Sequence, residues 1–151
     1  MKTSVARATV DLSDHPDLIV IYLGMRVHAL RGLAALFGIG PNLRAIERDK
    51  PEGLLAHESV WFGLRHIGFR QYWRDLESLE SFTRSAPHRD WWREFLKRDA
   101  GAGFWHETYR LKGGMEAIYL NMPPIGFAAF APEASPTGGR ATARDRLSHA
   151  S

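Results

Sequence analysis

Cysteine is absent from this 151-residue chain. Its absence excludes disulfides, thiolate nucleophiles and cysteine-ligated metals, and it suits a reducing compartment. Long apolar runs are missing as well. The most apolar early segment, 18–23, is far too short to cross a bilayer, and residues 1–14 lack the apolar stretch of a signal peptide. We therefore expect a soluble cytoplasmic protein with no membrane partner.

An excess of one charge sign is also lacking. The formal net charge is only +3, because 20 Lys and Arg residues are interleaved with 17 Asp and Glu residues. A nucleic-acid binder would gather its positive charge into a patch or stripe, so we expect no nucleic-acid partner. The run Gly38-Ile39-Gly40 lacks both the following lysine and the preceding strand of a phosphate-binding loop. Nucleotide binding is therefore not expected.

Aromatic residues, in contrast, are plentiful: five Trp, eight Phe and four Tyr. Such side chains fill cores, line pockets and dominate interfaces. Their number indicates either a lined cavity or a sizeable contact surface.

Five segments have the composition of strands. They are rich in β-branched and aromatic residues, and turn residues such as Gly63, Gly68 and the run 112–114 separate them. Pro123-Pro124 ends the last of them, since proline cannot donate to a strand ladder. The predicted strands are 17–28, 54–66, 67–73, 104–111 and 115–122.

Helical spacing of apolar residues appears in the intervening segments. Residues 29–48 are expected to form two helical pieces, because Gly38, Gly40 and Pro41 interrupt the pattern. Asp75 is predicted to cap a helix that runs to about residue 83. Ser85 is predicted as the N-cap of a further helix that runs through Leu96 and ends at 101–103.

The order of these elements predicts a ferredoxin-like βαββαβ unit of the α+β class. Helices would cover one face of its sheet. The strands are apolar on both faces, and a second copy of the chain would cover the open face, giving a dimeric α+β barrel. We expect a flexible segment at 1–16, the barrel domain at 17–122, and an extended arm with a loose tail at 123–151.

Residues 72–95, YWRDLESLESFTRSAPHRDWWREF, resemble a module of small monooxygenase-like dimeric α+β barrel proteins. In that module an aromatic strand end leads into a helix, then into Ser-x-Pro-His, then into an aromatic helix. The run GFWHETYR…EAIYLNMPP is similar to an uncharacterised, monooxygenase-like branch of the same superfamily. The resemblance covers about residues 19–124.

A second resemblance is chemically sharper. Haem-containing aldoxime dehydratases share the barrel unit, and carry a Pro-x-His that holds haem iron followed by a Tyr-His-Glu strand. Pro87-His88 and Trp105-His106-Glu107 stand in the matching order here. The similarity implies haem as a cofactor, His88 as its proximal iron ligand and His106 as a distal acid or base.

The sequence positions of these two histidines also suggest roles for them, independently of the resemblance. His106 lies mid-strand, where a buried imidazole suits proton transfer, or serves as a core residue bonded to a neighbour. His88 lies in the first turn of a helix, where the helix dipole disfavours its protonated form and leaves a ring nitrogen free. The same position suits a histidine that contacts substrate, or one that only packs or makes a hydrogen bond across the dimer.

Other polar and aromatic strand residues are candidates for a substrate pocket: Trp61, Arg70, Trp73, Tyr119 and Asn121. Core or dimer packing is the alternative for the aromatic ones. His57, His66 and Glu58 do not form a metal site in a regular strand, because the odd separation of the two histidines places them on opposite faces.

Three functional hypotheses follow for a small hydrophobic molecule in an apolar cavity. The first is an oxygenase or haem-assisted lyase. The second is cofactor-free oxygenation, in which the barrel supplies a dry pocket and one base. The third is a protein that binds the molecule without transforming it.

Overall fold

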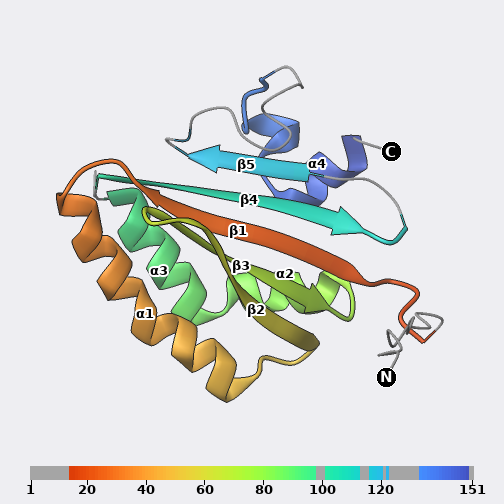
Figure 1. Ribbon diagram of the computed structural model, residues 1–151. Coiled ribbons are helices and arrows are strands. Elements are labelled where there is room, and N and C mark those ends of the chain that lie inside the picture. The colour runs from red at the N-terminus through yellow and green to blue at the C-terminus, as the bar shows by residue number, and fades with distance from the viewer. Residues whose placement is uncertain (1–13, 98–100, 113–115, 121, 123–132, 150–151) are drawn as a thin grey trace, which may run out of the picture.

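The computed structural model describes residues 14–97, 101–112, 116–120, 122 and 133–149. These residues form one antiparallel sheet with helices on one of its sides (Figure 1). No helix in these ranges is long and apolar enough to span a membrane. The elements are β1 (Ile19–Val27), α1 (Arg31–Asp49), β2 (Leu54–Gly63), β3 (His66–Trp73), α2 (Leu76–Arg84), α3 (Ala86–Lys97), β4 (Ala102–Arg110), β5 (Glu116–Leu120), η2 (Gly138–Arg140) and α4 (Ala143–His149).

The sheet has the strand order β2-β3-β1-β4-β5. Strand β1 is central and antiparallel to both neighbours, so that Tyr22 lies opposite Arg70 on one side and Glu107 on the other. The first four strands and their helices give the predicted βαββαβ arrangement, and β5 extends the sheet beyond β4 as the predicted hairpin partner. The ferredoxin-like α+β fold is confirmed.

Alternation along β1 separates a core face from an open face. Ile19 and Ile21 are buried on the core face with Trp73 and Leu79, which come from β3 and α2. Helices α1, α2 and α3 lie on this side of the sheet (Figure 1). The core between sheet and helices thus fixes which residues of β4 and β5 point toward the helices.

Helix α1 is continuous, and the predicted break at Gly38–Pro41 is wrong. Each glycine costs about 1 kcal/mol relative to alanine, and an interior proline costs about 3 kcal/mol because it removes a hydrogen bond and its ring crowds the preceding turn. Those costs did not end a helix whose last turn is anchored by the buried Ile46. Lys50, in the left-handed conformation, closes it by donating its N–H to the carbonyl of Ile46.

One predicted turn residue and one predicted cap residue differ in detail from expectation. Gly68 lies inside β3 rather than in a turn. A Cβ there would come within 2.4 Å of the Leu23 carbonyl oxygen, so the close approach of β1 requires glycine. Ser85 is the N-cap residue of α3 as predicted, since α3 begins at Ala86 and the Ser85 carbonyl accepts from the N–H of Arg89. Its hydroxyl, however, donates to the carbonyl of Phe82 at the end of α2. Asp75 caps α2 as predicted, since it accepts from the N–H of Ser78.

The C-terminal residues also differ from the expected loose tail. They include η2 and the helix α4, whose Leu147 is 1% exposed. Thr142 and Asp145 satisfy each other's backbone N–H at the start of α4, in a Thr-x-x-Asp capping box. The predicted arm at 123–132 lies outside the described residues, as do residues 1–13 of the N-terminal segment.

The two tryptophans predicted to line a pocket occupy contrasting environments, and this gives a stability test. Trp73 is 0% exposed in the core, whereas Trp61 is 75% exposed. We expect Trp73→Ala to lower the free energy of unfolding by about 3–5 kcal/mol, because it removes a large buried side chain. The matched Trp61→Ala control should change it by no more than about 0.5 kcal/mol. Urea unfolding followed by circular dichroism measures both, and equal effects would contradict the assignment of Trp73 to the core.

Candidate functional site

The candidate site lies on the helix-facing side of β4. His106 and Thr108 are two residues apart and therefore point to the same face, while the intervening Glu107 points to the open face. Strand β5 pairs with β4 so that Glu116 stands directly opposite Thr108 and diagonally from His106. The hairpin register thus brings a carboxylate beside the histidine that the sequence singled out.

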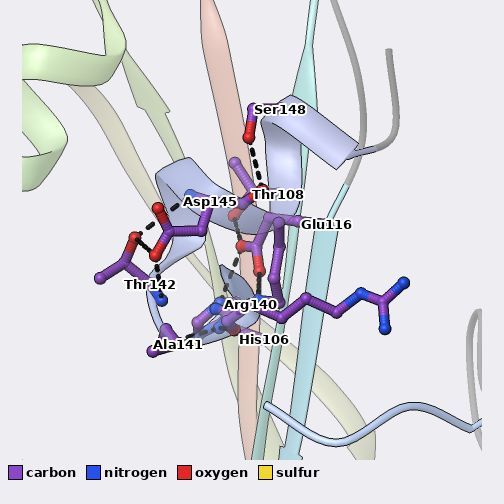
Figure 2. A network of polar contacts seen from close by, with 9 residues as sticks. His106, Thr108, Glu116, Arg140, Ala141, Thr142, Asp145 and Ser148 are labelled. Carbon is purple, nitrogen blue, oxygen red and sulfur yellow. Dashed lines mark hydrogen bonds and ion pairs between the residues drawn. The ribbon is translucent and has the colours of Figure 1, made fainter. Parts of the chain in front are cut away.

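Glu116 binds three partners from two elements, β4 and α4, with its two carboxylate oxygens (Figure 2). Its Oε1 accepts from the Nε2 of His106 at 2.9 Å and from the hydroxyl of Thr108. Its Oε2 accepts from the Nε of Arg146 on α4 at 2.8 Å. The Glu116 side chain is 0% exposed, so these bonds replace all of its contacts with water.

The electrostatics of Glu116 follow from this enclosure. Burial alone would raise the pKa of its carboxyl group. The hydrogen bonds from His106 and Thr108, together with the charges of His106 and Arg146, outweigh burial and lower that pKa to about 2. Glu116 is therefore ionised at neutral pH. An ionised carboxylate only accepts, so the Nε2 of His106 carries a proton and a neutral ring has its lone pair on Nδ1.

His88 lies near the start of α3, behind the turn that follows α2. Its Nδ1 is 3.1 Å from the carbonyl oxygen of Thr83 and must donate to it, so Nε2 carries the lone pair of the neutral ring. The rings of Phe82 and Trp91 flank it, with centroids 5.3 and 6.3 Å away.

Several influences act on the pKa of His88. Burial lowers it most, the bond to Thr83 raises it, and the charge of His106 lowers it further. His88 is therefore held neutral, and it is close enough to His106 for the two to interact electrostatically. The structure brings together the two histidines that the sequence placed on a strand and on a helix.

The geometry of His88 fits a haem ligand. Iron-binding histidines usually donate their second ring N–H to a carbonyl or carboxylate, which fixes the tautomer and orients the free nitrogen. The carbonyl of Thr83 supplies such an acceptor. His106 would then be the second imidazole on this side of the sheet.

The two predicted tryptophans do not contribute a polar group to this region. The indole N–H of Trp73 donates to the side-chain oxygen of Gln71 inside the core, and the amide of Gln71 in turn bonds to His57. Trp61 is largely exposed near the end of β2. Asn121 lies outside the described residues.

Arg70 and Tyr119 lie on the open face, opposite to the face of β4 that carries His106, and their role in a substrate pocket stays a prediction. Arg70 donates to Glu58 and to the hydroxyl of Tyr22 at 3.0 Å. The hydroxyl of Tyr119 donates to Glu107. Side chains alternate between the two faces of a strand, and the register between strands decides which residues share a face. The sequence alone did not give that register, so these residues could not be assigned to a face.

His57 and His66 lie on opposite faces, as the sequence indicated. His57 contacts Gln71 and the ring of Phe69 on the core face, whereas His66 accepts from the indole N–H of Trp105 on the open face. Among the residues that the structure describes, no three histidine, aspartate or glutamate side chains group closely enough to hold a metal ion.

Three members of the site were missed from the sequence: Thr108, Glu116 and Arg146. The first two could have been found by setting the register of the 104–122 hairpin and asking which residues flank His106. Arg146 lies 30 residues beyond Glu116 in a polar segment, and no local signal links the two.

Comparisons with solved structures agree with the fold. A conserved protein from Bacteroides thetaiotaomicron, described as a possible oxidoreductase, matches with a TM-score of 0.50 and 16% identity. The match covers 64% of this chain and 99% of that one. An aldoxime dehydratase matches with a TM-score of 0.51 and 22% identity over 94% of this chain and 42% of its own length. At such identities these likenesses establish the fold alone.

Sequence comparison is more specific. No protein of curated function matches the chain. A family model described as monooxygenase af470-like matches residues 18–127, which include β1 to β5 and both candidate histidines. The match covers most of the chain, and the chain therefore belongs to the monooxygenase af470-like family.

Proposed function

We propose that the protein is a monooxygenase-like enzyme that acts on a small hydrophobic molecule, with His106 as its acid–base residue. One observation carries the proposal: His106 donates its Nε2–H to a fully buried, ionised Glu116. A carboxylate in that position fixes the tautomer of a histidine and stabilises the imidazolium that forms when the ring takes a proton. The family description supports the class of reaction.

The surroundings of His106 suit apolar chemistry. Its ring lies edge-on to Phe104, and Phe104 in turn contacts Trp92 and Phe95 of α3. Apolar walls of this kind exclude water and strengthen the electrostatic effect of the few polar groups inside. Nδ1 of His106 would accept a proton from an electron-rich, weakly acidic substrate, whose anion then reacts with dioxygen. In this form the reaction needs no bound cofactor.

A second candidate is haem-dependent chemistry, and the geometry of His88 favours it specifically. His88 would hold the iron through Nε2, because Thr83 already fixes its Nδ1. Bound haem would supply redox or Lewis-acid chemistry at its iron. His106 would give or take protons, with Glu116 as its partner, as in the cofactor-free case.

We also propose that the protein forms a homodimer through the open face of the sheet. That face carries Tyr22, Trp105 and Tyr119 together with the ion pair of Arg70 and Glu58. Aromatic residues and arginine are enriched at protein interfaces. Sedimentation of the 17.1 kDa chain should give about twice the monomer mass, and a monomer at micromolar concentration would contradict the proposal.

The visible absorption spectrum of the protein distinguishes the haem-dependent candidate from the cofactor-free one. If His88 binds haem, the purified or haem-supplied protein should show a haem absorption band that His88→Ala abolishes and added imidazole restores. His66→Ala is the matched control, since His66 lies on the opposite face and should leave the band unchanged. A colourless protein that takes up no haem when supplied with it would exclude the haem candidate and leave the cofactor-free one.

The role of His106 is tested by turnover. His106→Ala should lower kcat by about 10²–10⁴-fold, which is the usual contribution of one acid–base group. The assay follows dioxygen consumption, or dehydration of an aldoxime if haem is bound, over a panel of small hydrophobic molecules. His66→Ala should keep its activity. Full activity in His106→Ala would contradict the assignment, and ligand binding without any consumption would favour a binding protein over an enzyme.

A further inference from the structure

The C-terminal helix brings a cation into the His106 site. The side chain of Arg146 is only 14% exposed. Its Nε donates to Glu116 Oε2 at 2.8 Å, and its Nη1 donates to the carbonyls of Arg140 and Ala141 at 3.1 and 3.2 Å. The guanidinium is thus held from both sides, by the carboxylate on β5 and by the backbone that precedes α4.

Helix α4 is itself attached at several points. Leu147 is buried, and Arg144 makes two hydrogen bonds to the carboxylate of Glu80 on α2, at 2.9 and 2.8 Å. The capping box of Thr142 and Asp145 fixes the first turn. This helix lies outside residues 18–127, the span that matches the family model. Arg146 therefore reaches the site from a segment that the family match does not include.

The charge balance of the site depends on this arginine. A buried carboxylate is stable only when it is paired, and Glu116 faces two groups that can carry positive charge. Arg146 is always charged, whereas His106 is charged only when protonated. Arg146 therefore balances the negative charge of Glu116 whatever the protonation state of His106, and it holds the carboxylate in place through Oε2.

We propose that Arg146 is a positioning residue for His106: by holding Glu116 Oε2, it leaves Oε1 to accept the Nε2–H of His106, so that a neutral ring keeps its lone pair on Nδ1. The proposal rests on the proposed acid–base role of His106. It means that α4 is part of the functional site.

Few other groups near His106 can influence its charge. His88 faces it from α3, and Arg110 lies on the same face of β4 four residues away. On α2, Glu80 is paired with Arg84 and Arg144. Strand β1 presents only apolar side chains there, Ile21 and Leu23. Among these charged groups, all within the described part of the chain, Arg146 is the one that contacts Glu116 directly.

The test uses ¹⁵N NMR of the histidine rings, which reports tautomer and protonation without an activity assay. We compare the wild type with Arg146→Met, Arg146→Lys and Arg144→Met, and assign His106 from the signal lost in His106→Gln. Arg144→Met is the matched control because it removes the ion pair between α4 and α2 but leaves Arg146 in place. Circular dichroism of each variant shows whether the fold is kept.

In the wild type, the proton that the His106 ring shares with Glu116 should lie on Nε2. Arg146→Met should lose much of this Nε2-protonated signal, because Glu116 loses the donor that holds Oε2 and its carboxylate can turn away from His106. Arg146→Lys should restore most of the wild-type signal, and Arg144→Met should not change it.

An unchanged His106 signal in a folded Arg146→Met variant would overturn the proposal. An equal loss of signal in Arg144→Met would also overturn it, because the effect would then belong to the docking of α4 and not to Arg146. A protein that fails every turnover assay contradicts the proposed function, yet the NMR result still decides whether Arg146 positions Glu116 and His106.

Discussion

The structure on the helix side of β4 depends on one buried carboxylate. Glu116 is shielded from water, and an unpaired charge in that position would cost several kcal/mol. Its two oxygens therefore need the donors of His106, Thr108 and Arg146. Meeting that need holds the β4–β5 hairpin in register and docks α4 against β5. It also gives His106 a defined tautomer. The hydrogen bond between His106 and Glu116 therefore does two things: it pairs a buried charge, and it orients the imidazole for proton transfer.

Both faces of β4 use this kind of pairing. On the open face, the buried Glu107 accepts from the hydroxyls of Tyr109 and Tyr119. Burial and the neighbouring carboxylate raise the pKa of Tyr109, so its hydroxyl remains a donor. Neighbouring residues of one strand thus serve two separate polar networks, one toward the helices and one toward the proposed dimer contact.

Most of the fold could be predicted from the sequence, because its signals are local. Apolar alternation in β1, the Asp75 cap and the hairpin before β5 act over a few residues, and each was found. The continuous helix α1 was missed because packing around Ile46 outweighed the local cost of glycine and proline. The site was predicted in part. His88 and His106 came from a resemblance, but the Glu116–Arg146 pair joins segments 30 residues apart that only tertiary structure brings together.

The alternation of β4 has a mechanical consequence. Glu107 and His106 are adjacent residues of one strand, so a shift of the β4 backbone would move both side chains together. The outer surface and the site beneath the helices therefore share a single strand backbone. A substitution at Tyr22 or Tyr109, whose rings contact each other on the open face, could reach His106 only by shifting that backbone.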